Sequence, residues 1–448
     1  MAINLRNIVF WMLDFLTGNK VKKNYNEINR IISNGESNDK QLKNILKYAK
    51  DNTSFYAKGN YEELKDFPVV NKSVLKREYN NIIVERLDDK KIHWTCTSGS
   101  TGTPLKIPQN EEKRNRTKAD LIFFNKKIGW ELGDRYIFIR SWVNLYKMSK
   151  LRIYAQNFIL VDTNKFDNAA MEELRNLLKK DKKIKCILGY ASALKNFVNF
   201  LEKKGDNSSM FNIKVIVTAS DELTAETKVK LKKMFKCKVV NRISNEEHGL
   251  LAMNFDGDDF FTLNTASYYF ELLKIDSDEP AKLGEIGRLV ITDLYNKKFP
   301  LIRYDIGDLA VGMSYDNNGS INKLKSFEGR GSEILINSNG IPITCVSLST
   351  HLCSIPGIIK YQLNVFKNRK VLYIVVDNTI FNSDMLEQNL VNVFGINDKV
   401  EYQIVENISI EKNGKYKPIK FHEEELVWKK CYLLPLLQDI LKTFIRHT

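Results

Sequence analysis

The sequence predicts an α/β protein, with a large N-terminal domain built on mixed sheets and a smaller α+β domain at the C-terminus. From residue 92 onward, short β-branched or aromatic runs alternate with helical stretches, which is typical of parallel strands joined by helices. Residues 259–294 instead read as successive strands separated by polar turns. A further set of strands and one helix follows Gly329-Arg330-Gly331, so the main domain boundary is expected near residue 331.

Within the large domain, residues 1–90 form a predicted helical segment, because apolar residues recur there at helical spacing, as in 40–50. Further helices are expected at 169–178, 191–201 and 224–235. The strands of the parallel sheet are expected at 136–139, 158–161, 184–188, 214–218 and 238–240.

The later strands of the large domain are expected at 260–263, 268–275 and 288–293, and they predict either an antiparallel sheet or a barrel attached to the parallel body. In the small domain, strands are expected near 334–336, 361–366 and 371–377, with a helix at 383–394. The predicted organisation is a large domain at 1–330, a small domain at 331–426 and an amphipathic extension at 427–448.

The chain is basic, with 69 Lys and Arg against 54 Asp and Glu and a formal net charge of +15. Such an excess fits nucleic acid, polyphosphate substrates, an anionic membrane surface, or lysines that are simply solvated. The basic residues come in pairs rather than long clusters, and the chain has no zinc-finger spacing, basic zipper or RNA-recognition signature. We therefore expect no nucleic-acid partner.

The cysteines and the chain ends bear on the compartment. Six cysteines lie far apart without a Cys-x-x-Cys pair, which is typical of a reduced, cytoplasmic protein. Neither a signal peptide nor an apolar span of about 20 residues is expected. Amphipathic helices are predicted over residues 5–16 and around Leu437, Ile440, Leu441 and Phe444. For the first helix, packing on the body and docking on a membrane face stay open. For the second, packing on the body and docking on a membrane or a partner stay open.

The strongest local signal is the run Thr-Ser-Gly-Ser-Thr-Gly-Thr-Pro at residues 97–104. Its glycines let the backbone approach an anion closely, and its hydroxyls add hydrogen-bond donors, so it predicts a polyphosphate-binding loop. It is not a Walker A loop, and a hydroxyl-rich loop without a function is the alternative. Gly-x-Ser-x-Gly, His-Glu-x-x-His and Cys/His metal spacings are absent, which gives a hydrolase triad little support.

Together with six later segments, this loop resembles the motif set of the adenylate-forming enzymes. The resemblance is closest to the phenylacetate–CoA ligase branch, which includes CapK-type capsular polysaccharide proteins and coenzyme F synthetase-like proteins. The order of the segments along the chain carries it. They are Ser-Asp-Glu-Leu at 220–223, Asn-Glu-Glu-His-Gly at 245–249, Gly-Glu-Ile-Gly at 284–287, Arg-Tyr-Asp-Ile-Gly-Asp at 303–308, Gly-Arg at 329–330 and Asn-Gly-Lys at 413–415.

The resemblance implies the adenylate-forming fold, with a mobile small domain that swings about a hinge near Ser332. It implies that Glu247 binds Mg²⁺, that Asp308 and Arg330 hold the ribose of ATP, and that Lys415 is the catalytic lysine. Glu247 and Lys415 are thus the expected catalytic residues. The other expected nucleotide contacts are Thr97, Ser98, Gly99, Ser100, Thr101, Gly102, Ser220, Asp221 and Glu222.

The chain departs from the family pattern at two places. Where relatives commonly carry an aromatic residue that stacks on adenine, this chain has Ile243, which predicts weaker nucleotide binding or binding through other contacts. Cysteine and histidine positions that some relatives use for zinc are residues such as Asn254 and Asn264 here, so no zinc is expected.

The leading hypothesis is ATP-dependent activation of a small carboxylic acid to an acyl-adenylate, followed by transfer to coenzyme A or another acceptor. ATP and Mg²⁺ are the expected cofactors, and capsular or cell-surface polysaccharide biosynthesis in the cytoplasm is the expected setting. The alternative is a catalytically degenerate member that acts as a binding or scaffold subunit of a membrane-associated complex. A monomer and a homodimer are equally compatible with the sequence, and so is a peripheral position at the inner face of the membrane.

Overall fold

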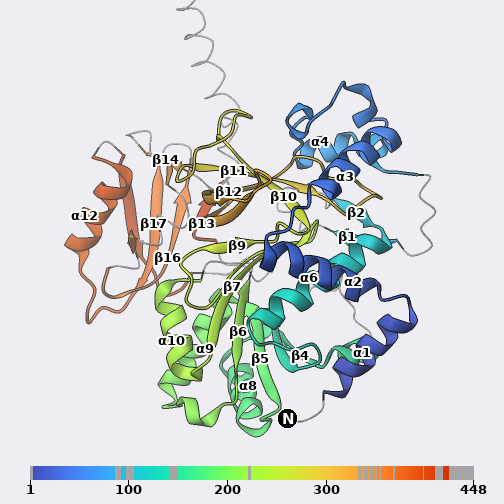
Figure 1. Cartoon of the computed structure of the whole chain (residues 1–448). Helices are drawn as coiled ribbons and strands as arrows, with labels where there is room; N and C mark the ends of the chain where they lie inside the picture. Colours follow the sequence, from blue (N-terminus) through green and yellow to red (C-terminus); the bar gives the residue numbers. More distant parts are fainter. Residues whose placement is uncertain are drawn as a thin grey trace, which may run out of the picture. The chain divides into compact units, whose positions relative to one another are not determined.

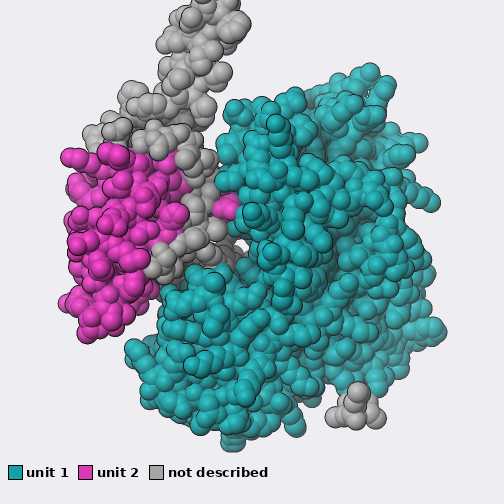
Figure 2. Space-filling view, turned by 60° about the vertical axis from the view of Figure 1, so that its left-hand side comes forward, with its two compact units in different colours: residues 1–327, 412–415 teal, residues 328–411, 416–448 magenta. Residues whose placement is uncertain are grey.

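The computed structural model falls into two compact units, with the boundary between Phe327 and Glu328 (Figure 2). The domain limits expected from the sequence stay a prediction, because the extension 427–448 lies outside the described residues. The structure describes residues 4–85, 92–96, 105–140, 150–219, 223–330, 335–337, 342–343, 348, 351–352, 355–366, 369–396, 398–408 and 417–422.

The first unit begins with the predicted helices. They are α1 (Leu5–Leu16), α2 (Lys20–Asn34), α3 (Asp39–Asn52), α4 (Lys72–Arg77) and α5 (Tyr79–Ile82), with 3₁₀ turns at Tyr56–Lys58 and Leu64–Asp66. A hairpin of β1 (His93–Cys96) and β2 (Lys106–Gln109) follows, and then the long helix α6 (Glu111–Lys127). The helical character expected of this segment is confirmed.

The described part of the first unit holds an eleven-stranded sheet in the order β10-β11-β12-β13-β9-β8-β7-β6-β5-β3-β4 (Figure 1). Its parallel half contains β3 (Arg135–Arg140), β4 (Phe158–Asp162), β5 (Ile184–Tyr190), β6 (Val215–Ala219) and β7 (Lys238–Asn245). The helices between these strands are α7 (Lys150–Gln156), α8 (Asn168–Lys180), α9 (Ala191–Lys203) and α10 (Ala225–Phe235), with 3₁₀ turns at Thr163–Lys165 and Ser208–Met210. The predicted alternation of strand and helix is confirmed.

The other half of the sheet contains β8 (Gly249–Asn254), β9 (Phe261–Leu263), β10 (Tyr268–Leu273), β11 (Ile286–Asp293), β12 (Tyr304–Tyr315) and β13 (Ile321–Arg330). The pairs β7–β8, β8–β9, β9–β13, β10–β11 and β11–β12 are antiparallel. Of the two predicted arrangements, an antiparallel sheet or a barrel, the antiparallel sheet is confirmed. It does not form a separate body, because β8 joins it to the parallel half.

Helices cover both faces of the parallel half (Figure 1). On β5, Ile187 packs with α8, α9 and α10, whereas its neighbours Cys186 and Leu188 pack with α2 and α6. Because successive side chains of a strand point to opposite faces, a strand covered on both sides is apolar throughout. This explains why the parallel strands appear in the sequence as short continuous apolar runs.

The second unit has its own apolar core on a four-stranded sheet in the order β18-β17-β16-β19. These strands are β16 (Ile358–Val365), β17 (Lys370–Val376), β18 (Val400–Ile404) and β19 (Ile419–Phe421), and the two-residue strands β14 (Leu335–Ile336) and β15 (Pro342–Ile343) pair separately. Helix α12 (Ser383–Phe394) packs on the sheet through Leu386, Leu390 and Phe394. The predicted α+β character of this part is confirmed.

In the described residues, no helix combines the length and the apolar character needed to cross a bilayer. The same residues contain no cluster of three or more His, Cys, Asp or Glu side chains that could hold a metal ion. The expectation of no zinc stays a prediction.

Candidate active site

Many of the predicted site residues lie outside the described part of the chain. These are the loop residues Thr97, Ser98, Gly99, Ser100, Thr101 and Gly102, the adenine-pocket residues Ser220, Asp221 and Glu222, the hinge residue Ser332, and Lys415. The backbone of Arg330 ends β13, but its side chain is not among the described ones. Glu247 and Asp308 are described, and their surroundings define the candidate site.

The described flanks of two of these segments lie at the ends of strands. Cys96 pairs with Lys106 at the loop end of the β1–β2 hairpin, so residues 97–104 connect the two strands there. Ala219, the last residue of β6, pairs with Arg242 on β7, a few residues before Glu247. The carboxyl end of parallel strands is where ligands bind in open α/β sheets.

Glu247 lies in the tight turn between β7 and β8. Asn245 pairs with Gly249 across the turn, and the Oδ1 atom of Asn245 accepts the backbone N–H of His248 at 2.8 Å. Gly249 has φ +102°, and a Cβ there would lie 3.0 Å from the side chain of Thr117 on α6. A glycine is therefore required for the turn to reach α6 so closely.

Two side chains from other elements hold the main chain at Glu247. Gln109, the last residue of β2, donates from Nε2 to the carbonyl of Glu247 at 3.1 Å. The hydroxyl of Tyr268, the first residue of β10, donates to the carbonyl of His248. With both carbonyls engaged, the half-buried carboxylate of Glu247 is the oxygen donor that this residue can offer to a ligand.

His248 lies behind the turn and is completely buried. Its ring stacks on Tyr304 with centroids 5.8 Å apart and meets Tyr268 edge-on at 5.4 Å. Nδ1 lies 3.2 Å from Oδ1 of Asn245, an oxygen that also accepts the His248 backbone N–H, so the neutral ring carries its hydrogen on Nδ1. Burial lowers the pKa of His248 to about 3; Asp293 opposes this effect and Lys113 adds to it.

A buried ion pair supports the turn from below. Lys113 on α6 and Asp293 at the end of β11 are both fully buried, and Nζ of Lys113 lies 2.6 Å from Oδ2 of Asp293. The same ammonium group lies 3.0 Å from the hydroxyl of Tyr268, which in turn donates to the carbonyl of His248. Asp293 also accepts the backbone N–H groups of Tyr295 and Asn296 through Oδ1. Four segments of the chain thus meet at one charge pair.

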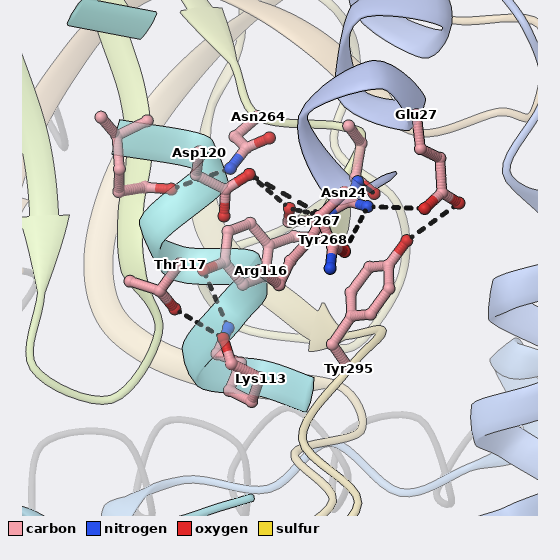
Figure 3. Close-up of polar contacts among 12 residues, drawn as sticks. Asn24, Glu27, Lys113, Arg116, Thr117, Asp120, Asn264, Ser267, Tyr268 and Tyr295 are labelled. Carbon is pink, nitrogen blue, oxygen red and sulfur yellow. Dashed lines mark hydrogen bonds and ion pairs between the residues drawn. The ribbon is translucent and has the colours of Figure 1, made fainter. Parts of the chain in front are cut away.

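One turn further along α6, Arg116 is also completely buried and contacts three other segments of the chain (Figure 3). It donates to Oγ of Ser267 at 2.8 Å and to the carbonyl of Ala266 at 2.7 Å, and it pairs with Glu27 of α2 at 2.9 Å. Its guanidinium also lies over the ring of Tyr295, 4.2 Å from the centroid. Arg116 therefore fixes α2 and the start of β10 relative to α6.

Asp120 completes this polar layer on α6. Its Oδ1 accepts the hydroxyl of Ser267 at 2.7 Å and lies 3.9 Å from Nε of Arg116 (Figure 3). Burial raises the pKa of Asp120 above its usual range, and the charge of Arg116 counteracts this. The Ser267 hydroxyl, just before β10, therefore accepts a hydrogen bond from the Arg116 guanidinium and donates one to the Asp120 carboxyl group.

Asp308 is presented by a bulge in β12. Arg288 pairs with Leu309 and Val290 with Asp305, so residues 306–308 of β12 face the single residue Leu289 of β11. Gly307 has φ +78°, and its N–H is held by Oδ1 of Asp305 at 2.8 Å. Bulges of this kind redirect side chains next to functional sites.

Arg303, the first residue of the same motif, has a structural role. Its φ of +46° is unusual for a side-chain-bearing residue. The guanidinium pairs with Glu271 at 2.9 Å and donates to the carbonyls of Lys65 and Phe67 at 3.0 and 2.9 Å. These bonds hold the N-terminal segment against β12 and offset the cost of the strained backbone.

Ile243 is half-buried on β7 and packs against the core of the antiparallel strands. It contributes no aromatic surface. The sequence reasoning did not find Gln109, Lys113, Tyr268 or Asp293, because each is distant in sequence from the motif that it supports. A lysine in a helix as rich in charge as α6 gives no signal that it will be buried.

Comparisons with known proteins agree with this architecture. Residues 335–422 match the family model of the CapK C-terminal domain. The chain is 23% identical over 438 residues to Protein CapK of Staphylococcus aureus, which covers 90% of this chain and 93% of that protein.

Among solved structures, 2-hydroxyisobutyryl-CoA ligase in the postadenylation state has a TM-score of 0.67 at 16% identity, covering 90% of this chain and 91% of that one. ATP-bound MatB from Rhodopseudomonas palustris has a TM-score of 0.52 at 14% identity, covering 76% and 68%. The chain thus has the fold of the adenylate-forming CoA ligases. Within that fold, it resembles CapK along nearly its whole length and carries a CapK-type C-terminal domain. The resemblance deduced from the motifs is confirmed at this level.

The Lys113–Asp293 pair predicts a large and specific stability effect. Lys113→Met leaves the Asp293 carboxylate buried without its counter-charge, which costs about 3–5 kcal/mol of unfolding free energy. Urea unfolding measures it. The double variant Lys113→Met/Asp293→Asn is expected to recover much of the loss, and Lys118→Met, at an exposed position of α6, to cost under about 1 kcal/mol. A loss below about 1 kcal/mol for Lys113→Met would contradict this role.

The buried neutral His248 predicts a pH dependence. Between its ordinary pKa of 6.5 and its native value of about 3, the unfolded chain binds a proton that the native ring does not, so stability rises with pH. From pH 7 to pH 5, this residue lowers the unfolding free energy by about 2 kcal/mol. The comparison is urea unfolding of wild type and His248→Gln at both pH values. Equal pH dependence of the two proteins would show that His248 protonates freely in the native state.

Proposed function

We propose that the protein is an adenylate-forming ligase. It activates a carboxylic acid with ATP, releases pyrophosphate, and transfers the acyl group from the acyl-adenylate to coenzyme A or another acceptor. The observation that supports this most is the fold shared along 90% of the chain with 2-hydroxyisobutyryl-CoA ligase, a structure in complex with R3-HIB-AMP. Other structures of this fold hold ATP, or 2-HIB-AMP together with CoA.

In this reaction, an oxygen of the substrate carboxylate attacks the α-phosphorus of ATP, and the bond to the departing pyrophosphate breaks. Such a step depends on positioning and charge neutralisation rather than on covalent help from the protein. Asp308 at the β12 bulge and Arg330 at the end of β13 would hold the ribose. The hydroxyl-rich loop at 97–104 would bind the departing phosphates, and Lys415 would neutralise charge at the α-phosphate.

The turn at Glu247 fits the predicted magnesium ligand. Its carboxylate is a hard oxygen donor of the kind that Mg²⁺ prefers, and the carbonyls of Glu247 and His248 are already engaged by Gln109 and Tyr268. When bound, Mg²⁺ would neutralise charge on the phosphate oxygens. Gln109 and Tyr268 hold the main chain of the turn and thereby limit where the Glu247 side chain can lie.

The likeness to CapK supports a role in capsular or cell-surface polysaccharide biosynthesis. We place the reaction in the cytoplasm, where ATP is available and thiols stay reduced. The competing hypothesis is a degenerate scaffold subunit. It is favoured by Ile243, which packs against the core and gives no aromatic surface where relatives commonly stack a ring on adenine. ATP–pyrophosphate exchange distinguishes the two, because a scaffold supports none with any acid.

The first test concerns Lys415. With a panel of carboxylic acids, the wild type should catalyse acid-dependent exchange of labelled pyrophosphate into ATP, and Lys415→Ala should reduce the rate about 10²–10³-fold because a charge-stabilising contact is lost. Lys420→Ala is the matched control, since Lys420 is exposed on the nearby strand β19. Absence of exchange with every acid would favour the scaffold hypothesis.

The second test concerns Glu247. Glu247→Gln keeps the shape of the side chain but removes the charge, so we expect exchange to fall about 10²-fold and the Mg²⁺ concentration needed for half-maximal rate to rise. Glu246→Gln, at the exposed neighbouring position, should leave both quantities nearly unchanged. If Glu247→Gln lowered the rate without any change in Mg²⁺ dependence, the residue would not be the metal ligand.

A further inference from the structure

The helix α1 is apolar on the side that faces away from the protein. The large apolar side chains on this side are between 45% and 70% exposed. An ordinary surface helix shows the reverse arrangement, with its apolar side toward the core and its charged side toward water. The exposed residues are Leu5, Ile8, Val9, Met12, Leu13, Phe15 and Leu16.

The opposite side of α1 is firmly attached to the body. Asn4 and Asn7 donate from their side-chain amides to the carbonyl of Leu132 at 2.9 and 3.3 Å. Phe10 and Trp11 pack against the core beneath α2 and α6. The helix therefore cannot turn its apolar side inward without breaking these contacts.

Within residues 4–23, which form α1 and the start of α2, the charges are almost all positive, and the exposed Glu131 lies near Asn7, Trp11 and Lys22. Asp14 is the one acidic residue between positions 4 and 23, and it is buried. Its two carboxylate oxygens accept the N–H groups of Val21 and Lys22 at 2.9 Å each. The basic residues of the same stretch are Arg6, Lys20, Lys22 and Lys23. Of these, Lys20 pairs with the exposed Glu111 of α6.

Aromatic rings lie beside these cations. The Arg6 guanidinium is 5.1 Å from the centroid of the exposed ring of Tyr154 on α7, and Lys22 lies 5.1 Å from that of Trp11. An apolar strip with a basic and aromatic border matches the interface of a membrane that contains anionic lipid. A second copy docked on the same face would bring like-charged borders together, because a two-fold interface places equivalent residues near one another.

We propose that α1 is a membrane-binding helix, which lies flat in the headgroup region of an anionic bilayer with its apolar side inserted. Its 12 residues reach about 18 Å, which is too short to span a bilayer but suits a helix in the interface plane. The apolar side chains supply the binding energy, and the basic border gives the preference for negatively charged lipid. The inference does not depend on the catalytic proposal.

Flotation of the full-length protein with lipid vesicles tests it. The wild type should float with vesicles of phosphatidylcholine and phosphatidylglycerol, and much less with phosphatidylcholine alone. The triple variant Ile8→Glu/Met12→Glu/Leu16→Glu should bind at least ten-fold more weakly. The control Val229→Glu/Ile380→Glu/Ile396→Glu adds the same charge at exposed apolar positions away from α1, and should bind like the wild type.

Further measurements separate the remaining outcomes. Lys22→Gln/Lys23→Gln should reduce the preference for phosphatidylglycerol, and higher salt should do the same in the wild type. Circular dichroism and the unfolding midpoint report whether each variant is folded; if the glutamate triple is not, Ile8→Asn/Met12→Gln/Leu16→Gln replaces it. The proposal is overturned if folded α1 variants bind vesicles like the wild type, which would assign binding to another segment. It is also overturned if α1 variants abolish a vesicle-independent dimer seen by analytical ultracentrifugation.

Discussion

The ion pair between Lys113 and Asp293 is the constraint on which the candidate site depends. Two charges removed from water are tolerated only when each is closely paired and hydrogen-bonded, so both side chains have little freedom. The pair joins α6 to the end of β11, and through the Tyr268 hydroxyl it reaches the turn that carries Glu247. The position of a residue expected to bind a metal thus follows from a charge pair in the core.

A different device presents Asp308. There the ladder between β11 and β12 is interrupted, and Gly307 adopts a conformation that few other residues accept. Arg303, at the start of the same motif, holds the N-terminal segment through two backbone carbonyls and Glu271. A single six-residue motif therefore combines one residue that anchors the fold, Arg303, with one that lies in a bulge of the β11–β12 ladder, Asp308.

Helix α1 shows how hydrophobic patterning alone can mislead. Its apolar spacing predicts a helix, as found, but the usual inference that the apolar side packs on the body is wrong here, because Asn7, Phe10, Trp11 and Asp14 make the contacts. The buried carboxylate of Asp14 accepts the N–H groups of Val21 and Lys22 in the first turn of α2, and these bonds fix the rotation of α1 about its axis. Among the described residues, the apolar side of α1 is left exposed.

The sequence by itself determined the class of fold, the alternation of strands and helices in the parallel half, and the family resemblance, because these depend on local periodicity and on short motifs that are contiguous in the chain. It also indicated Glu247 and Asp308. It gave no expectation for α6, β12 or β13. Only the tertiary structure decided that the antiparallel strands extend the parallel sheet, that Lys113 and Arg116 are buried, and that Gln109 and Tyr268 hold the turn at Glu247. These contacts join residues 20 to 180 positions apart, and no local pattern distinguishes a lysine that will find a buried aspartate from one that will remain in water.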